Sequence, residues 1–413
     1  MTPHPVAWHV THWCDDPYSQ GAYSALLPGG DNAARRLLSA PIEGRLFLAG
    51  EAFNHDHSAM THSAWDSGLR AAEAVAATSS KNVIVIGAGF AGLAAASALQ
   101  AQGRQVLVLE ARDRTGGRVH TLSLGGVAVD VGAAWLQQYA RNPLARRAEQ
   151  LGLPTRATDF SQPLAAAWDG ALPDINLAYD RLKNAVDRNQ PLAPSVERYL
   201  NTLSSTDRRA AGYAIDANLI LEAGLPLTQL SAHMLDEEGV GDGDQFLPLG
   251  YRQLLEDAAC GLDIRLNQPV QHIAWDGQGV RVDDFAADAC VCTVPIPVLK
   301  QLRFTPGLPE AYRDALGLFT MGRLEKVVLQ FDERWWPASK DGYLRWYDAP
   351  PNWGEWLDLT DAVGTPLIAG LIAGDAVDRH HRGKDDQQIA LDACQKLGDW
   401  AAAIRRNNQP ADG

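Results

Sequence analysis

A glycine-rich run between two apolar segments is the feature of this chain that most directly predicts chemistry. Gly87, Gly89 and Gly92 form a GxGxxG pattern, and the acidic residue Glu110 follows about 20 residues further on. Gly87 permits a tight turn, Gly89 lets the backbone approach a pyrophosphate, and Gly92 lets a helix pack closely on a strand. An acid at this spacing can bind ribose hydroxyls, so the pattern predicts a dinucleotide site.

The segments around these glycines have the composition that such a site requires. Residues 81–86 form a β-branched run without polar alternation, which is typical of a strand buried on both faces of a parallel sheet. Residues 93–100 favour a helix whose free N–H groups would face the phosphates, and residues 105–110 predict a second parallel strand. A turn that is merely rich in glycine is the alternative, but it leaves the strands, the helix and the acid unexplained.

Length and charge limit the class of protein. The 413 residues suggest two or three domains, and a hydrophobic share of 46% is enough for sizeable cores. A net charge of −14 argues against a nucleic-acid partner and against docking on an anionic membrane. The uncharged stretch 83–99 is short and broken by glycines, so it is not read as a membrane span. The five cysteines form no CxxC pair and no signal peptide is apparent, so we expect a reducing, cytoplasmic location; the oligomeric state is not indicated.

Two motifs after the glycine-rich unit resemble those of the flavin-containing amine oxidases, the family of monoamine and polyamine oxidases. Residues 111–118 end in Gly-Gly-Arg, and residues 129–135 resemble the family's D-x-G-x-x-W segment beside the flavin ring. The resemblance implies FAD as the cofactor. It also implies non-covalent binding, because Ala22 stands where some members carry the cysteine that is linked to FAD. The FAD contacts implied by the two motifs are Arg112, Gly117, Arg118, Gly132, Ala133 and Trp135.

The order of the motifs differs from that of the family. Family chains open with the GxGxxG unit, whereas about eighty residues precede it here and resemble the family's C-terminal end. We therefore predict a circular permutation, in which joining residue 413 to residue 1 restores the family order and residues 77–81 form the new link. The further FAD contacts that the resemblance implies are Gly50, Glu51, Ser63 and Ala64 in the early segment and Val270 in a later strand.

The resemblance implies catalytic roles for two residues. Lys326 begins an alternating segment, 326–331, and matches the family's flavin-proximal lysine, which would hold a water at the flavin and assist reoxidation by dioxygen. Lysine is scarce in this chain, where arginine supplies most of the 36 basic residues. Tyr23 would be one wall of an aromatic cage that orients a neutral amine. The ordinary alternatives are a solvated lysine at a strand end and a buried core tyrosine.

Three residues bear on the substrate. The second cage position falls at Met60, which is not aromatic and leaves half a cage. Gln137 stands where several polyamine oxidases carry an acid or a histidine, which weakens a polyamine assignment. Trp346 lies in a tryptophan-rich region and is a candidate for a substrate funnel, although core packing suits most of those side chains better. No histidine group has the spacing of a ligand set such as HExxH, so no metal site is predicted.

These observations predict an α/β fold of two discontinuous domains. Residues 13–150 and 241–298 would form a Rossmann-like FAD-binding domain, and residues 151–240 and 299–400 an α+β substrate domain with a mixed sheet and helices. The predicted reaction oxidises a small-molecule amine to an imine and reduces dioxygen to hydrogen peroxide. The alternatives are an L-amino-acid oxidase, which needs an arginine in the substrate cavity, a flavin desaturase or porphyrinogen-type oxidase, and a flavin-binding protein without activity.

Overall fold

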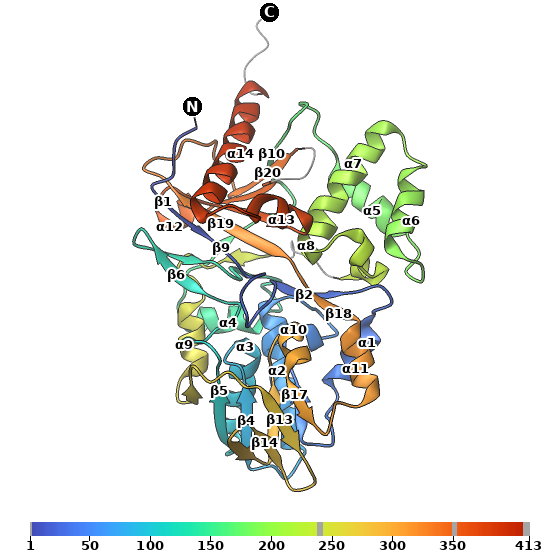
Figure 1. The fold of residues 1–413 in the computed structure, drawn as a ribbon. Helices are drawn as coiled ribbons and strands as arrows, with labels where there is room; N and C mark the ends of the chain where they lie inside the picture. Colours follow the sequence, from blue (N-terminus) through green and yellow to red (C-terminus); the bar gives the residue numbers. More distant parts are fainter. Residues whose placement is uncertain (1, 238–242, 349–352, 408–413) are drawn as a thin grey trace, which may run out of the picture.

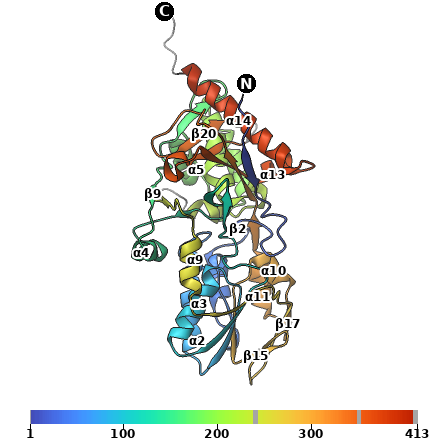
Figure 2. The ribbon, with the colours of Figure 1, turned by 90° about the vertical axis from the view of Figure 1, so that its left-hand side faces the viewer.

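The computed structural model describes residues 2–237, 243–348 and 353–407. Figures 1 and 2 show two lobes, one above the other, with the glycine-rich unit in the lower lobe and the long last helix at the top. Segments from the beginning, the middle and the end of the chain contribute to the region where the lobes meet.

The lower lobe is built on a five-stranded parallel sheet with the order β12-β5-β4-β16-β3. Strand β4 and helix α3 confirm the predicted strand–turn–helix unit, and β5 confirms the second strand. The apolar residues of β4 are buried, as a strand covered on both faces requires. The bounds are β3 Leu46–Leu48, β4 Asn82–Ile86, α3 Phe90–Ala101, β5 Gln105–Leu109, β12 Asp263–Arg265 and β16 Ala289–Cys292.

The first eighty residues complete this lobe. Strand β3 pairs in parallel with β16 and forms one edge of the sheet, and helix α2 (Thr61–Ala76) lies along α3. The two helices approach closely because Gly68 has no side chain: a Cβ there would lie 2.1 Å from the carbonyl oxygen of Ala91. Small residues at this crossing therefore bring α2 against the glycine-rich unit.

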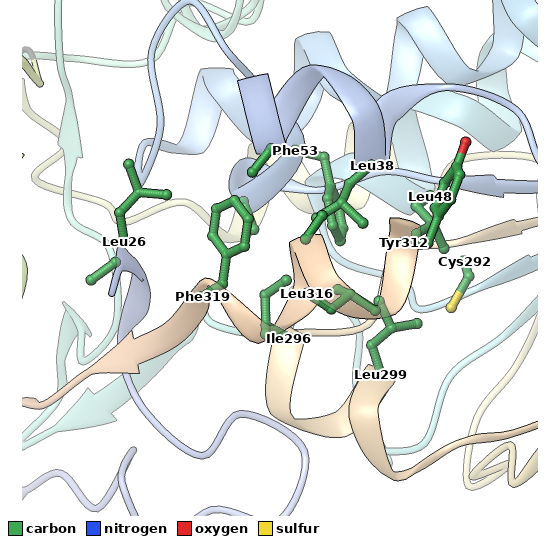
Figure 3. Close-up of a cluster of buried hydrophobic side chains, with 14 of the residues drawn as sticks. Leu26, Leu38, Leu48, Phe53, Cys292, Ile296, Leu299, Tyr312, Leu316 and Phe319 are labelled. Atoms are coloured by element: carbon green, nitrogen blue, oxygen red, sulfur yellow. The ribbon is translucent and has the colours of Figure 1, made fainter. Parts of the chain in front are cut away.

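A second layer covers the other side of the lower lobe. Strand β13 pairs antiparallel with β14 and parallel with β17, while β15 pairs with β14. Figure 3 shows part of the apolar cluster that fills this lobe, including Leu38, Phe53, Leu299 and Phe319. The remaining elements of the lobe are α1 Asn32–Ser39, η1 Glu51–Phe53, α4 Pro143–Gln150, α9 Arg252–Ala259, β13 His272–Trp275, β14 Val280–Val282, β15 Phe285–Ala287, α10 Ile296–Gln301, β17 Arg303–Thr305 and α11 Glu310–Gly317.

The upper lobe is a six-stranded mixed sheet with the order β1-β19-β22-β21-β20-β10, in which only the β10–β20 pair is parallel among the described strands. Helix α14 packs against this sheet and buries Trp400, and a helical layer flanks the sheet (Figure 1). The elements are β1 Ala7–Val10, β10 Leu164–Ala167, α5 Ile175–Ala185, α6 Leu192–Leu200, α7 Ser205–Ile215, the π-helical η2 Asp216–Ile220, α8 Leu221–Ala223, β19 Leu324–Gln330, β20 Tyr343–Tyr347, β21 Glu355–Asp358, α12 Thr360–Val363, β22 Leu367–Ala373, α13 Asp375–His381 and α14 Asp386–Asn407.

Short strand pairs connect the lobes. Strand β2 (Tyr23–Leu26) pairs with β18 (Phe319–Gly322), which places Tyr23 opposite Gly322, and the chain then runs directly into β19 with Lys326. Strand β11 (Gln245–Phe246) pairs with β8 (Trp135–Leu136) and with β9 (Arg156–Ala157). A hairpin of β6 (Thr121–Leu124) and β7 (Val127–Asp130) lies beside them. These pairings bring the predicted catalytic residues to the junction.

The predicted domain boundaries can be compared with these pairings. Strand β17 pairs with β13, and α11 packs on α1, so both elements belong to the lower lobe although they follow residue 298, where the predicted boundary lies. The chain then leaves the lower lobe through β18. The predicted boundary at residue 241 lies outside the described residues. The division into two discontinuous domains stays a prediction at the level of exact boundaries.

Two contacts place the first residues of the chain against the last helix, which bears on the predicted circular permutation. The thiol of Cys394 lies 3.2 Å from the carbonyl oxygen of Pro3, and a Cβ on Gly398 would lie 2.4 Å from Oγ1 of Thr2. Residues 2 and 3 therefore lie against α14, while residues 77–81 join α2 to β4. Permutation is tolerated where such ends lie close together, and it stays a prediction of the sequence.

A rearranged chain tests this prediction. Joining residue 413 to residue 1 through a short glycine-serine linker and opening the chain between Ser80 and Lys81 should preserve the fold, because no strand or helix is cut. We expect cooperative thermal unfolding with a midpoint within about 5 °C of the parent, measured by circular dichroism. Opening the chain between Val327 and Val328, inside β19, is the control that should prevent folding. An unfolded product from the first rearrangement alone would contradict the prediction.

Candidate active site

A cavity of about 1090 Å³ lies where the two lobes meet, with lining residues from both. Most of the predicted site residues line it, although they come from widely separated parts of the chain. These residues are Tyr23, Gly50, Glu51, Met60, Ala64, Gly87, Gly89, Glu110, Arg112, Gly117, Arg118, Gly132, Ala133, Trp135, Gln137, Val270 and Lys326.

Three predicted site residues lie off the cavity. Gly92 packs on the turn itself, since a Cβ there would lie 1.8 Å from the carbonyl oxygen of Gly87. Ser63 is fully buried within α2, and its hydroxyl has no hydrogen-bond partner among the described residues. Trp346 packs in the apolar cluster between the upper sheet and α14. Gly92 acts through close packing, whereas no contact of Trp346 with the cavity is found.

The glycine-rich turn forms an open cradle at the lower end of the cavity. Gly87 has a φ of 100°, in the region that favours glycine, and a Cβ there would meet Thr293 Oγ1 at 2.5 Å. Gly89 is the N-cap of α3, and the nearest atom to a Cβ at this residue is the carbonyl oxygen of Gly116, 3.7 Å away. Bare backbone and the free N–H groups of a helix N-terminus thus face the cavity, which suits a phosphate group.

Glu110 fastens this turn to the end of β5. One carboxylate oxygen accepts a hydrogen bond from the backbone N–H of Ala88 at 2.7 Å, and the other from the N–H of Arg112 at 2.9 Å. Glu110 is only 5% exposed, yet it lines the cavity. It therefore fixes the glycine-rich turn and presents its acceptor oxygens beside it.

Arginine side chains tie the early segment to the glycine-rich unit. Arg112 donates to both carboxylate oxygens of Asp16 at 2.8 Å, and Arg118 donates to Glu51 at 2.8 Å and to the carbonyl oxygen of Ala22 at 3.0 Å. Burial opposes the charge of Glu51, but Arg118 and hydrogen bonding hold its pKa below the usual range. Glu51 is therefore an anion that fixes the junction of the two segments.

Lys326 is held at the middle of the cavity wall. Its ammonium donates to the backbone carbonyl oxygens of Asp130 at 3.0 Å and Gly132 at 2.8 Å, and lies 5.9 Å from the ring centre of Trp135. The side chain is only 5% exposed, and burial lowers its pKa to about 8, partly offset by the attraction of Asp130. The alternative of a solvated strand-end lysine does not describe this geometry.

Tyr23 and Met60 lie on the same cavity. The hydroxyl of Tyr23 donates to the carbonyl oxygen of Leu221 at 2.5 Å, so the ring is fixed against the end of the π-helical segment η2. Burial raises the pKa of Tyr23, which therefore stays neutral at physiological pH. Met60 is the N-cap residue of α2 and is buried. A rigid aromatic wall and an apolar side chain thus border the space near Lys326.

Two acidic residues that sequence reasoning missed line the upper part of the cavity. Burial raises the pKa of Glu222 to about 8, and the nearby charges of Glu355 and Asp244 add to this effect. Glu355 accepts hydrogen bonds from Tyr343 at 3.0 Å and from Arg345 at 2.8 Å. The one local signal for Glu222 is its position as a lone acid in the apolar segment 219–225.

The described residues contain no group of three or more histidine, cysteine, aspartate or glutamate side chains placed to hold a metal ion. The described cysteines are free, and none of the described helices has the length and hydropathy needed to cross a bilayer.

Comparisons with known proteins agree with this geometry. The family of flavin-containing amine oxidoreductases matches residues 1–76 and 90–411. Polyamine oxidase 2 of Arabidopsis thaliana is 31% identical over 364 residues, covering 79% of this chain and 71% of that protein. Lysine-specific histone demethylase 1 homolog 1 of the same plant is 32% identical over 336 residues, covering 72% of this chain, and the chain spans 40% of its length.

A solved structure shares the fold. Putrescine oxidase bound to putrescine superposes with a TM-score of 0.60 and 21% identity, covering 78% of this chain and 81% of that one. The chain therefore belongs to the family of flavin-containing amine oxidoreductases, whose cofactor is FAD. The residues present fit that group, because the glycine cradle accepts a pyrophosphate and Glu110 offers acceptors for ribose hydroxyls.

Replacing Gly89 tests the assignment of the cradle. Gly89→Val adds carbon atoms where a Cβ would make only an ordinary contact, 3.7 Å from the carbonyl oxygen of Gly116, so the fold should persist while the phosphate-binding backbone is blocked. We expect the purified variant to contain less than about a tenth of the parent's FAD, measured by absorbance at 450 nm, because close backbone approach is lost.

Gly212→Val is the matched control, since no atom lies within 4 Å of a Cβ at that position on α7. This control should retain the parent's FAD content and unfolding temperature. A Gly89→Val protein that still carries stoichiometric FAD would show that the cofactor binds elsewhere.

Proposed function

We propose that this protein is an FAD-dependent oxidase that converts a diamine or polyamine to an imine and reduces dioxygen to hydrogen peroxide. The observation that carries the proposal is the acidic upper end of the cavity. Glu222 lines it, and the part of the chain that the structure describes offers the Glu222 carboxylate neither a hydrogen bond nor an ion pair. A carboxylate in that position favours a ligand with positive charge.

Charge at the two ends of the cavity supports this substrate class. Glu355 is already engaged by Arg345 and Tyr343, whereas Glu222 is left for the ligand. The apolar and aromatic side chains of Tyr23, Met60 and Leu371 surround the space between Glu222 and the cofactor end. A diamine could thus place one amine near Lys326 in an apolar slot and a second, charged amine at Glu222.

The residues near Lys326 have separate tasks in the proposed reaction. FAD, when bound, supplies the two-electron acceptor. Tyr23 forms a rigid wall that orients the reacting amine and excludes water, which favours the neutral amine over the ammonium ion. Lys326 presents a fixed ammonium beside the reacting centre, where reduction of dioxygen develops negative charge. Ala22 lines the cavity without a side-chain atom for a covalent link, so FAD is held non-covalently.

The alternatives find less support in the same residues. An L-amino-acid oxidase needs an arginine for the substrate carboxylate, but the arginines that line the described cavity, Arg112 and Arg118, are paired with Asp16 and Glu51. The ordered Lys326 site disfavours a desaturase or porphyrinogen-type oxidase. Gln137 stands where several polyamine oxidases carry an acid or a histidine, which argued against a polyamine substrate. Glu222 supplies an acid in the same cavity, so that argument no longer applies. The similarity to a polyamine oxidase and to a putrescine oxidase supports this choice.

Replacing Glu222 tests the substrate class. Glu222→Gln keeps the shape of the side chain and removes its charge, so the preference for a diamine should fall. We expect kcat/KM for putrescine, divided by that for butylamine, to drop about 10- to 100-fold, which corresponds to losing one charge-assisted hydrogen bond. Peroxide formation at fixed oxygen concentration measures both substrates.

The pH dependence of the diamine preference provides a second test of the Glu222→Gln variant. The pKa of Glu222 is raised to about 8, so its carboxylate, and with it the diamine preference, should grow as the pH rises from 6 to 9. In Glu222→Gln this preference should stay flat across that range. Asp180→Asn is the control, because Asp180 also lines the cavity but is exposed and pairs with Lys183. A Glu222→Gln enzyme with the parent's substrate ratio would refute the diamine assignment.

Lys326→Met tests the oxidase half of the proposal. Removing the ammonium should slow reoxidation by dioxygen about 100-fold, as expected when one fixed electrostatic group is lost, and change anaerobic reduction by the amine much less. Stopped-flow absorbance separates the two steps. Lys300→Met is the matched control, since Lys300 donates to the carbonyl oxygen of Phe319 outside the cavity. An unchanged oxygen rate in Lys326→Met would exclude the role of this residue.

A further inference from the structure

Asp130 is a buried acid that the proposed reaction leaves without a role. It ends strand β7 and is 4% exposed. One carboxylate oxygen accepts hydrogen bonds from the hydroxyl of Thr121 at 2.5 Å and from the backbone N–H of Tyr251 at 3.2 Å. The other oxygen is buried and has no hydrogen-bond partner among the described residues. A buried carboxylate that is only half satisfied costs stability unless a nearby positive charge compensates it.

Lys326 supplies a positive charge near this carboxylate. The ammonium of Lys326 donates to the backbone carbonyl oxygen of Asp130 itself at 3.0 Å, so the carboxylate and the ammonium belong to the same small region. Each group acts on the other electrostatically: Asp130 favours the charged form of Lys326, and Lys326 favours the charged form of Asp130. Asp130 therefore gives Lys326 a hydrogen-bond acceptor through its backbone and a favourable charge through its carboxylate.

We propose that Asp130 is a positioning residue that fixes the Lys326 ammonium on the cavity wall and keeps it protonated at neutral pH. The inference rests on the proposed oxidase function, in which that ammonium faces the developing charge on dioxygen. Burial alone would drive Lys326 toward the neutral amine, and a neutral amine would lose this electrostatic effect. Asp130 preserves the charge without occupying the cavity, since it is not among the lining residues.

The other charged groups around the pair do not replace this interaction. Glu325 precedes Lys326 on β19 but binds Thr11 and the backbone of residues 13 and 14. His9 on β1 acts on Lys326 in the opposite direction when it is protonated, and burial lowers the pKa of His9. Arg252 on α9 donates to the carbonyl oxygen of Thr121 and favours the charged form of Asp130.

The acid–base behaviour of the two groups fits a pair that is charged at neutral pH. Burial raises the pKa of Asp130 to about 6, although Thr121, Tyr251 and Lys326 oppose this rise. Burial lowers the pKa of Lys326 to about 8, against the attraction of Asp130. Between these values the carboxylate and the ammonium are both charged. Loss of either charge should move the pKa of the remaining group further from its ordinary value.

Competitive labelling tests the proposal without relying on catalysis. The FAD-bound protein is treated with trace acetic anhydride at a series of pH values from 6 to 11, and acetylation of Lys326 is quantified by peptide mass spectrometry. Asp130→Asn retains an acceptor oxygen for Thr121 and Tyr251 but removes the charge. We expect the midpoint of Lys326 labelling to fall by about 1 pH unit or more, the usual effect of removing a close opposite charge.

A matched variant and a kinetic measurement separate this role from a merely structural one. Asp288→Asn makes the same change at a half-buried acid far from Lys326 in the sequence, which accepts hydrogen bonds from the backbone N–H groups of Lys81 and Asn82, and should leave the midpoint unchanged. In Asp130→Asn the pH profile of reoxidation should shift downward together with the labelling midpoint. An unchanged midpoint in a folded Asp130→Asn protein overturns the proposal, whether or not the diamine assignment is correct.

A reciprocal measurement applies if Asp130→Asn does not fold. Removing the ammonium in Lys326→Met should raise the folded-state pKa of Asp130 above its value of about 6, further from the unfolded value. The folded state then retains a proton that the unfolded state releases, so the free energy of unfolding should fall as the pH rises from 6 to 8. The parent should show a shallower slope, because Glu222 contributes to both proteins and Asp130 is largely ionised in the parent above pH 6. Parallel pH dependence of the two proteins in urea denaturation would overturn the proposal.

Discussion

The carboxylate of Glu325 is the anchor on which the junction of the two lobes depends. It accepts hydrogen bonds from the hydroxyl of Thr11 at 2.6 Å and from the backbone N–H groups of Trp13 at 3.0 Å and Cys14 at 2.9 Å. Adjacent residues on a strand face opposite sides, so Lys326 points the other way, into the cavity. One dipeptide thus holds the early segment on one side of β19 and places an ammonium on the cavity wall on the other. Residues 15–22 join this anchor to β2, whose pairing with β18 places Tyr23.

Charge is distributed unevenly along the cavity. At the lower end, Arg112 and Arg118 form ion pairs with Asp16 and Glu51. These pairs hold the early segment against the glycine cradle. At the upper end Glu222 has no hydrogen bond or ion pair among the described residues, and we propose that it binds a cationic ligand. Lys326 lines the same cavity and is favoured in its charged form by Asp130.

The sequence predicted the parts of the site whose geometry depends on local spacing. The turn at Gly87 to Gly92, the strands on either side and Glu110 were located within a few residues, because glycine conformation and strand burial are local properties. Lys326 and Tyr23 were located by family resemblance rather than by spacing. Glu222 and Asp130 were missed as functional groups, because their importance comes from burial and from neighbours that are distant in sequence. Trp346 was proposed from aromatic crowding, which cannot distinguish a cavity wall from the core beneath α14.

Strand β3 has a consequence for how the protein is made. Its parallel partner β16 lies at residues 289–292, so the edge of the cofactor sheet is synthesised long before the strand that receives it. At ordinary elongation rates of about 5–20 residues per second, residues 46–48 remain without their partner strand for roughly tens of seconds after they are synthesised. Strand β4, which pairs with β16 on its other side, waits as well. The sheet therefore cannot close until more than two thirds of the chain has been translated, and its assembly is a late event.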